Sequence, residues 1–294
     1  NSLASEIKLS EEELEKIKGT GQGERVTKYD MISYLKSRGQ KTNPVVQQKG
    51  TPAVNKMGGQ DQVIEMSRMA KLTAAHMINS KQTSAHVQSF VETDVTALWN
   101  WREKVKNAFF ERENEKLTFT PLFITALIKA LKDFPLLNSS VQGDTILQKR
   151  AINIGLATSM ADGNLIVPVI KNADHLNLVG LAKAVNDLAT RARNQALRPE
   201  EIQDGTFTFT NIGNFGALTG TPIINQPQVG IIAMGVIRKM PAVIETPKGD
   251  FIGIRKKVII SHSFDHRIIN GAMGGQFVKN MADYLENWDE SLTL

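Results

Sequence analysis

The sequence of 294 residues contains no cysteine. The chain therefore has no disulfide scaffold, thiolate zinc site, iron–sulfur cluster or cysteine nucleophile. No apolar run approaches the ~20 residues that a membrane-spanning helix needs. A signal-peptide pattern is also lacking. These absences favour a protein of a cytoplasmic-type compartment that does not act in a membrane.

The sequence also lacks any concentration of charge. Its formal net charge is +5, but no block of five like charges indicates a nucleic-acid-binding tail. We therefore expect a mixed, solvated surface and no nucleic-acid partner. With 41% hydrophobic and 22% charged residues, the composition is that of a globular protein, long enough for one large domain and a small appendage.

The first 38 residues predict a small helical unit. Residues 10–13 (Ser-Glu-Glu-Glu) form a capping box at the start of one short helix, and a second helix begins near Thr27. The loop between them, residues 19–25, is rich in glycine, which adopts positive φ readily. Residues 39–62 hold many Gly, Gln, Asn and Lys, which predicts a flexible linker.

Residues 63–294 predict one domain in which helices and strands interleave without a regular βαβ alternation. The expected helices are 67–81, 96–116, 121–133, 178–197 and 271–288, and the expected strands are 87–95, 151–157, 165–170, 206–210, 229–236 and 257–264. We therefore expect the α/β class, with a mixed sheet in a two-layer sandwich rather than a doubly wound sheet.

Five histidines are the first candidates for chemistry. His76, His86 and His175 lack chemical partners nearby in the sequence, so structural roles are expected for them. His262 and His266 are four residues apart, which on a helix would pair them on one metal ion. Their segment predicts a strand instead, in which the two Cα atoms would lie ~13 Å apart, so no metal site is expected.

His266 lies where the predicted strand 257–264 ends and Gly271 opens a helix. A histidine at such a junction is held by rigid elements and can still face a cleft. Its neighbours Asp265 and Arg267 are expected to pair as structural support, as most adjacent charges do. His266 is therefore the leading functional candidate among the histidines.

The residues around His266 carry a family resemblance. Asp-His-Arg-x-x-Asn-Gly-Ala at 265–272 resembles the signature His-x-x-x-(Asp/Asn)-Gly of the dihydrolipoyl acyltransferases, the core components of 2-oxo acid dehydrogenase complexes. Residues 153–169, 206–213 and 221–228 also resemble that family and occur in its order. The resemblance implies an acyltransferase catalytic domain at 63–294, with a fold similar to that of chloramphenicol acetyltransferase.

The N-terminal unit resembles a second module of the same complexes. Its Gly-Thr-Gly-x-x-x-Arg loop between two short helices is similar to that of the peripheral subunit-binding domain, although Glu24 stands where the family has glycine. The first helix of that module is mostly missing from the sequence. The resemblance implies a truncated peripheral subunit-binding domain at 1–38, joined by the linker at 39–62.

The resemblance implies a chemistry for three residues. His266 would be the general base that takes the proton from a thiol, and the Thr210 hydroxyl would donate to the oxyanion. Asn270 stands where many relatives carry Asp; as an amide it orients through hydrogen bonds only, so we expect positioning rather than proton transfer. Coenzyme A would be a substrate, and the lipoyl group would be carried on a domain outside this chain.

The resemblance further implies homotrimers that assemble into a 24-mer or a 60-mer. Each active site would lie between two subunits, so His266 and Thr210 would come from different chains. The expected partners are the lipoyl domain and the 2-oxo acid dehydrogenase and dihydrolipoamide dehydrogenase components, whose binding the truncated module would weaken. The compartment would be the bacterial cytoplasm, or the mitochondrial matrix in a eukaryote.

The acyl group is the least determined property. Succinyl-transferring relatives tend to show Gly-Arg-Glu where this chain has Gly271-Ala272-Met273, which favours an acetyl group, as in pyruvate dehydrogenase complexes, or a branched-chain acyl group. Two alternatives stay open. One is a non-catalytic core subunit that only binds partners, which Asn270 motivates. The other is an antibiotic O-acetyltransferase of the same fold, against which the upstream module argues.

Overall fold

The computed structural model describes residues 17, 19–21, 23, 25–38, 62–160 and 163–292. The contacts within the chain divide it into two units, residues 1–65 and 66–294. The helix predicted after the capping box at 10–13 and nearly all of the predicted linker lie outside the described residues.

The described part of the first unit contains one helix, α3 (Lys28–Arg38). Asp30 in its first turn accepts hydrogen bonds from the backbone N–H and the hydroxyl of both Thr20 and Thr27. The backbone hydrogen bond from Thr27 and then that from Thr20 lower the pKa of Asp30. One carboxylate thus ties the glycine-rich loop to the start of the helix.

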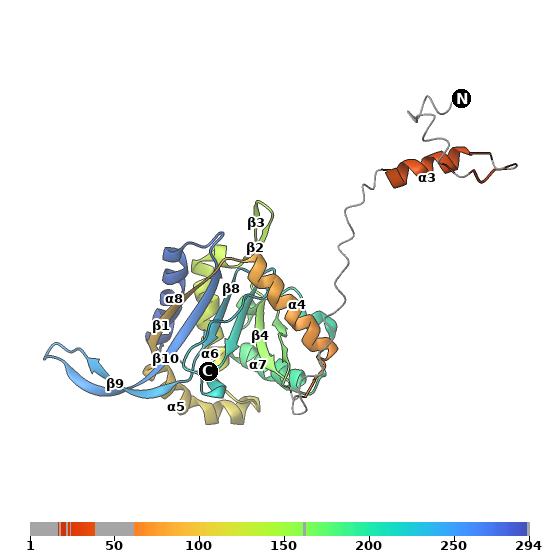
Figure 1. The fold of residues 1–294 in the computed structure, drawn as a ribbon. Helices are drawn as coiled ribbons and strands as arrows, with labels where there is room; N and C mark the ends of the chain where they lie inside the picture. The colour runs from red at the N-terminus through yellow and green to blue at the C-terminus, as the bar shows by residue number, and fades with distance from the viewer. Residues whose placement is uncertain are drawn as a thin grey trace. The chain divides into compact units, whose positions relative to one another are not determined.

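The second unit is built on an eight-stranded sheet (Figure 1). Its strands are β1 (His86–Asp94), β4 (Ile154–Ser159), β5 (Leu165–Ile166), β6 (Val169–Ile170), β7 (Phe207–Asn211), β8 (Gly230–Met234), β9 (Arg238–Ile244) and β10 (Phe251–Asp265). They follow the order β1-β10-β8-β7-β4-β5, with β6 paired to β4 and β9 to β10. The β4–β7 and β7–β8 pairs are parallel and the others antiparallel, so the predicted mixed sheet is confirmed.

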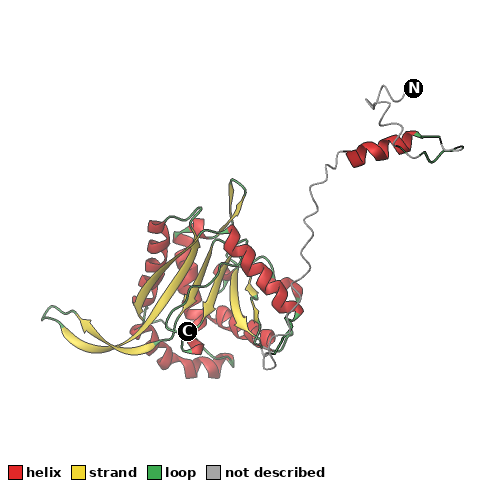
Figure 2. Cartoon of the chain, viewed as in Figure 1, coloured by secondary structure: helices red, strands yellow, loops and turns green. Residues whose placement is uncertain are grey.

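A layer of helices covers one face of this sheet (Figure 2). The helices of the unit are α4 (Arg68–Thr83), α5 (Thr96–Glu113), α6 (Phe119–Asp133), α7 (Leu178–Arg193) and α8 (Gly271–Glu286). Helix α8 packs on β1 and β10, α7 packs on β4, and α6 contacts both helices. Because α6 lies inside this layer, nine of its side chains are buried. The two-layer α/β sandwich predicted from the sequence is confirmed.

The remaining elements are short. The 3₁₀ segments are η1 (Pro135–Leu137), η2 (Ala173–His175), η3 (Pro199–Ile202) and η4 (Gly213–Phe215), and β2 (Ser139–Gln142) pairs with β3 (Thr145–Gln148) in a separate hairpin. The strand predicted at 165–170 is two short strands, because Pro168 has no N–H to continue a ladder. Strand β9 was not predicted; its Pro241 is tolerated because β9 pairs only with β10.

The second half of β10, from Val258 to Asp265, has one apolar and one polar face, and both are buried. Toward the helices it presents Val258, Ile260, His262 and Phe264. Its other face carries Ser261, Ser263 and Asp265, which are fully buried too. The segment before β8 crosses that face, since the Thr219 and Ser261 hydroxyls are hydrogen-bonded at 2.6 Å. The strand that leads to His266 is therefore enclosed on both sides.

Candidate active site

His266 follows the last residue of β10 and is exposed. Its backbone N–H donates to the Ala85 carbonyl oxygen at 2.8 Å, which ties the end of β10 to the start of β1. Its ring is stacked on the ring of Phe264, with centroids 6.1 Å apart and an interplanar angle of 28°. The imidazole is thus accessible while the backbone beneath it is fixed.

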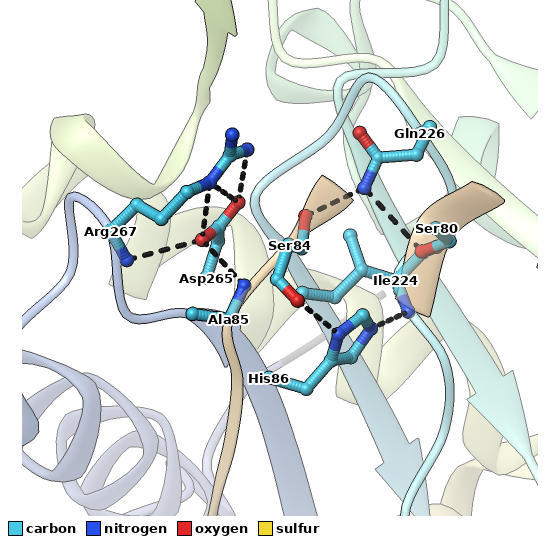
Figure 3. A network of polar contacts seen from close by, with 8 residues as sticks. All are labelled: Ser80, Ser84, Ala85, His86, Ile224, Gln226, Asp265 and Arg267. Carbon is cyan, nitrogen blue, oxygen red and sulfur yellow. Dashed lines mark hydrogen bonds and ion pairs between the residues drawn. The ribbon is translucent and has the colours of Figure 1, made fainter. Parts of the chain in front are cut away.

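Asp265 anchors this junction from inside (Figure 3). Its fully buried carboxylate accepts hydrogen bonds from the Arg267 guanidinium at 2.6 to 3.0 Å and from the backbone N–H groups of Ala85 and Arg267. Burial raises the pKa of Asp265, but the hydrogen bonds and charge of Arg267, together with a hydrogen bond from Ser84, lower it by more. The pairing of Asp265 with Arg267 that the sequence predicts is present, and it fixes the backbone on both sides of His266.

His86 connects the same region to the loop before β8 (Figure 3). Its Nδ1 lies 3.0 Å from the Ser84 carbonyl oxygen, and its Nε2 accepts the Ile224 N–H at 3.0 Å. Gln226 donates from its amide to the Ser84 hydroxyl at 2.6 Å. His86 therefore has the structural role expected for it, and the segment 221–228 supports the strand beside His266.

Asn270 is the N-cap of α8. Its Oδ1 accepts the Met273 backbone N–H at 2.8 Å, which satisfies one of the free donors at the helix start. The side chain is exposed and lies on the same junction as His266. Asn270 therefore fixes the start of α8, four residues after His266, through the hydrogen bond to the Met273 N–H.

Thr210 lies near the end of β7, half-buried. Phe207 and Phe209 of this strand are buried in the core, so Thr208 and Thr210 belong to the opposite face. Thr210 lines a cleft of about 710 Å³ at the carboxyl ends of β4, β7 and β8. This volume lies in the range of small-molecule sites, ~300–1,000 Å³.

The wall of the cleft that the sequence did not reveal comes from α5 and α6. The Trp99 and Phe119 rings are stacked at 4.8 Å, with the Lys256 ammonium over Trp99 and the Arg102 guanidinium over Phe119. Trp99, Arg102 and Phe119 line the cleft. Trp99 and Arg102 are close together in the sequence. No local pattern predicts that α5 and α6 lie at the end of β7.

One chain does not bring Thr210 and His266 together. The register aligns Thr210 with Ala233 and Ala233 with Ser261, and His266 lies five residues beyond Ser261. The two residues are therefore roughly 19 Å apart, from about 17 Å along the strands and about 10 Å across them. They lie at opposite ends of the sheet.

The other histidines have different surroundings. His262 is fully buried, and burial lowers its pKa to about 4, while the hydrogen bond with the Gly274 carbonyl oxygen opposes that shift. Its Nε2 has no hydrogen-bond partner. His76 lies on α4, and His175 is 74% exposed near Asp174. Across residues 62–160 and 163–292 no group of three His, Asp or Glu side chains could hold a metal ion.

Comparison with known proteins gives the family. Residues 58–293 match the family described as "2-oxoacid dehydrogenases acyltransferase (catalytic domain)". The succinyltransferase component of the 2-oxoglutarate dehydrogenase complex of Bacillus subtilis is 39% identical over 91% of this chain and 64% of its own length. Other relatives are named as branched-chain and acetyl-transferring components.

Solved structures agree. A probable dihydrolipoamide acetyltransferase of Listeria monocytogenes is 38% identical, with a TM-score of 0.76 over 80% of this chain and 98% of that one. A dihydrolipoamide acetyltransferase of Azotobacter vinelandii is 31% identical, with a TM-score of 0.75 over 81% and 96%. This chain belongs to the acyltransferase family of the 2-oxo acid dehydrogenase complexes, as the sequence resemblance indicated.

The chain spans about two thirds or less of the length of most of the curated relatives. None of its described helices has the length and apolarity to cross a membrane.

Proposed function

We propose that the chain transfers an acyl group between the dihydrolipoyl group of a lipoyl domain and coenzyme A, as the core acyltransferase of a 2-oxo acid dehydrogenase complex. The family transfers acyl groups between these two thiols, with the lipoyl group on a separate domain. The cleft beside Thr210 has the volume to take the reacting end of such a substrate.

The observation that carries this proposal is the pair His266 and Asn270 at the β10–α8 junction. Work on the Azotobacter vinelandii relative concerns the role of a serine, a histidine and, four positions later, an asparagine in its catalytic mechanism. His266 and Asn270 are four positions apart as well, and Thr210 supplies a hydroxyl as the serine does.

The chemistry needs one base and one donor. The Nε2 of His266 takes the proton of the attacking thiol, and the thiolate forms a bond to the thioester carbonyl carbon. The carbonyl oxygen becomes an oxyanion that accepts the Thr210 hydroxyl proton in a hydrogen bond. When the intermediate collapses, the other carbon–sulfur bond breaks and the leaving thiolate receives the proton from the imidazolium. We assign Asn270 to orientation, through the helix start that it caps.

We further propose that each site is formed by two copies of the chain, His266 from one and Thr210 from the other. Their roughly 19 Å separation within one chain, given by the strand register, supports this arrangement because both groups must reach one reacting carbon. We also propose a trimer that assembles into a 24-mer or a 60-mer; one similar solved structure, 31% identical, is described as the cubic core of the pyruvate dehydrogenase multienzyme complex.

Mixing two inactive variants tests both parts of this proposal. His266→Ala and Thr210→Val chains carry different tags, are co-expressed in equal amounts, and are purified through both tags. In randomly mixed assemblies about a quarter of the sites combine an intact His266 with an intact Thr210, so about a quarter of the wild-type transfer rate should return. A rate no higher than that of either variant alone would place both groups in one chain. Thr210→Ser, which keeps the hydroxyl, serves as the active control.

For the acyl group we propose acetyl or a branched-chain acyl group, on the Gly271-Ala272-Met273 segment alone. The relatives are divided among succinyl, branched-chain and acetyl transfer, so identity does not choose between them. Transfer rates to dihydrolipoamide from acetyl-, isobutyryl- and succinyl-coenzyme A should be lowest for succinyl. A highest rate with succinyl-coenzyme A would overturn this choice.

We propose that the N-terminal unit belongs to a peripheral subunit-binding domain, which would contact the dehydrogenase components of the complex. The Thr20–Asp30–Thr27 hydrogen bonds support a defined loop in this unit. Deleting residues 1–61 should leave acyl transfer to free dihydrolipoamide intact and abolish any retention of the partner enzymes in a pull-down.

A further inference from the structure

Three rings follow one another along the end of β10. His262, Phe264 and His266 occupy alternate positions, with ring centroids 5.1 Å apart for the first pair and 6.1 Å for the second. In the described part of the chain, the His266 side chain makes no hydrogen bond or ion pair, and its ring contact is the stack on Phe264. Phe264 is therefore the neighbouring ring in a position to restrict the exposed imidazole.

The Phe264 ring is itself held in one orientation. It is fully buried, and the first turn of α8 passes directly over it. A Cβ atom at Gly274 would lie 2.5 Å from two carbon atoms of this ring, whereas non-bonded carbon atoms prefer about 3.5–4.0 Å. The His262 imidazole bonds the Gly274 carbonyl oxygen at 3.1 Å, which keeps the helix against the strand.

The glycine that follows shows that this space is local. A Cβ atom at Gly275 would have no heavy atom within 4 Å. Both positions lie inside α8, where glycine is less favourable than alanine by about 1 kcal/mol. The Phe264 ring leaves no room for a side chain at position 274, whereas position 275 has room for one.

We propose that Phe264 is a positioning residue for His266, and that Gly274 is the glycine that leaves room for its ring. The inference rests on the proposed role of His266 as general base. An exposed side chain without hydrogen bonds visits several rotamers, while a base must be aimed at the thiol proton. A displacement of about 1 Å at such a group can cost ~10²-fold in rate. The stacked ring restricts the imidazole before the substrate arrives.

Gly274→Ala is the direct test, with Gly275→Ala as its matched control. Both replacements add one methyl group to neighbouring positions of one helix. We expect Gly274→Ala to lower kcat about 10- to 100-fold with KM for the acyl-coenzyme A unchanged, because the added Cβ pushes the Phe264 ring against the imidazole. Gly275→Ala should stay within about twofold of the wild type. Equal rates for the two variants would overturn the inference.

Crystal structures of both variants separate this inference from the proposed function. A displaced or disordered His266 ring in Gly274→Ala, with an unchanged ring in Gly275→Ala, supports the positioning role whatever the rate. An unmoved His266 ring overturns it. A displaced ring with normal kcat would instead refute His266 as the base. Should Gly274→Ala fail to fold, Phe264→Leu carries the same test: it relieves the crowding, removes the flat ring, and should give the same fall in kcat with a disordered His266.

Discussion

Two histidines near the end of β10 have opposite surroundings: His262 is buried and His266 is exposed. His262 is enclosed by the Phe207, Phe264 and Phe277 rings, and its pKa is lowered to about 4. His266, four residues later, is exposed at the junction with α8. The same residue type is held neutral in the core at one position and is exposed to solvent at the other. His262 lies within β10, whereas His266 lies just past its last residue. Four variants test this contrast between the buried and the exposed histidine.

Removing the exposed imidazole should have the largest effect. His266→Ala should lower the rate of acyl transfer to dihydrolipoamide by ~10²–10⁴-fold, the range that general-base catalysis supplies. The matched control is His175→Ala, which removes a surface histidine that is 74% exposed. Normal turnover by His266→Ala in a steady-state assay would show that the exposed end of β10 has no chemical role.

The buried imidazole should instead make the fold sensitive to acid. The unfolded chain binds a proton at His262 near pH 6.5, but the folded chain does so only near pH 4, so protons favour the unfolded state between these values. The free energy of unfolding should therefore fall by on the order of 3 kcal/mol as the pH drops from 6.5 to 4.

Chemical denaturation at a series of pH values measures this loss for the wild type and for His262→Leu. The leucine variant keeps a similar volume and has no proton to bind, so its stability should fall less over the same pH window. Identical pH dependence in both proteins would mean that His262 is not the group responsible.

Asp265→Asn should weaken the support of the exposed end. The asparagine amide would bring donors toward the Arg267 guanidinium and the Ala85 N–H, which now share a carboxylate. Breaking a buried ion pair typically costs 3–5 kcal/mol, and because Arg267 is 37% exposed we expect about 2 kcal/mol. Because the pKa of Asp265 is lowered, this difference from the wild type should be present at pH 7 and shrink as the pH falls below about 4. A constant difference across that range would contradict the charge argument.

Asn270→Ala should have the smallest effect on stability. It removes the cap of α8, which typically costs ~1 kcal/mol, whereas Asn270→Asp keeps an acceptor for the Met273 N–H. Thermal unfolding of the two variants measures the difference. If Asn270→Ala were as stable as Asn270→Asp, the cap would contribute nothing.

Local patterns were enough to predict the class of fold and to single out His266, whereas Thr210 and Asn270 became candidates only through the family resemblance. The helices predicted at 121–133, 178–197 and 271–288 correspond to α6, α7 and α8, which were found near their true limits. Strand β9 was missed because Pro241 and exposed charges argue against a strand unless the partner strand is known. Its existence depends on the hairpin with β10.

The supporting contacts of His266 could not be predicted in the same way. Ala85 bonds residues 180 positions away, and His86 meets Ile224 across 138 positions. No local periodicity encodes such pairs. The burial of His262 had a signal, since it alternates with Ile260 and Phe264 along one face. No sequence signal shows that Gly274 lies against the Phe264 ring, because this contact depends on how closely α8 approaches β10.

The distance between Thr210 and His266 has a consequence for how the protein behaves on dilution. If the two groups come from different copies, as proposed, a separated chain would hold only half of each site. Specific activity would then fall with concentration once assemblies dissociate, and would return on reconcentration without refolding. A newly synthesised chain would not consume thioester substrates before it had assembled with other copies. Assembly would therefore control when acyl transfer begins.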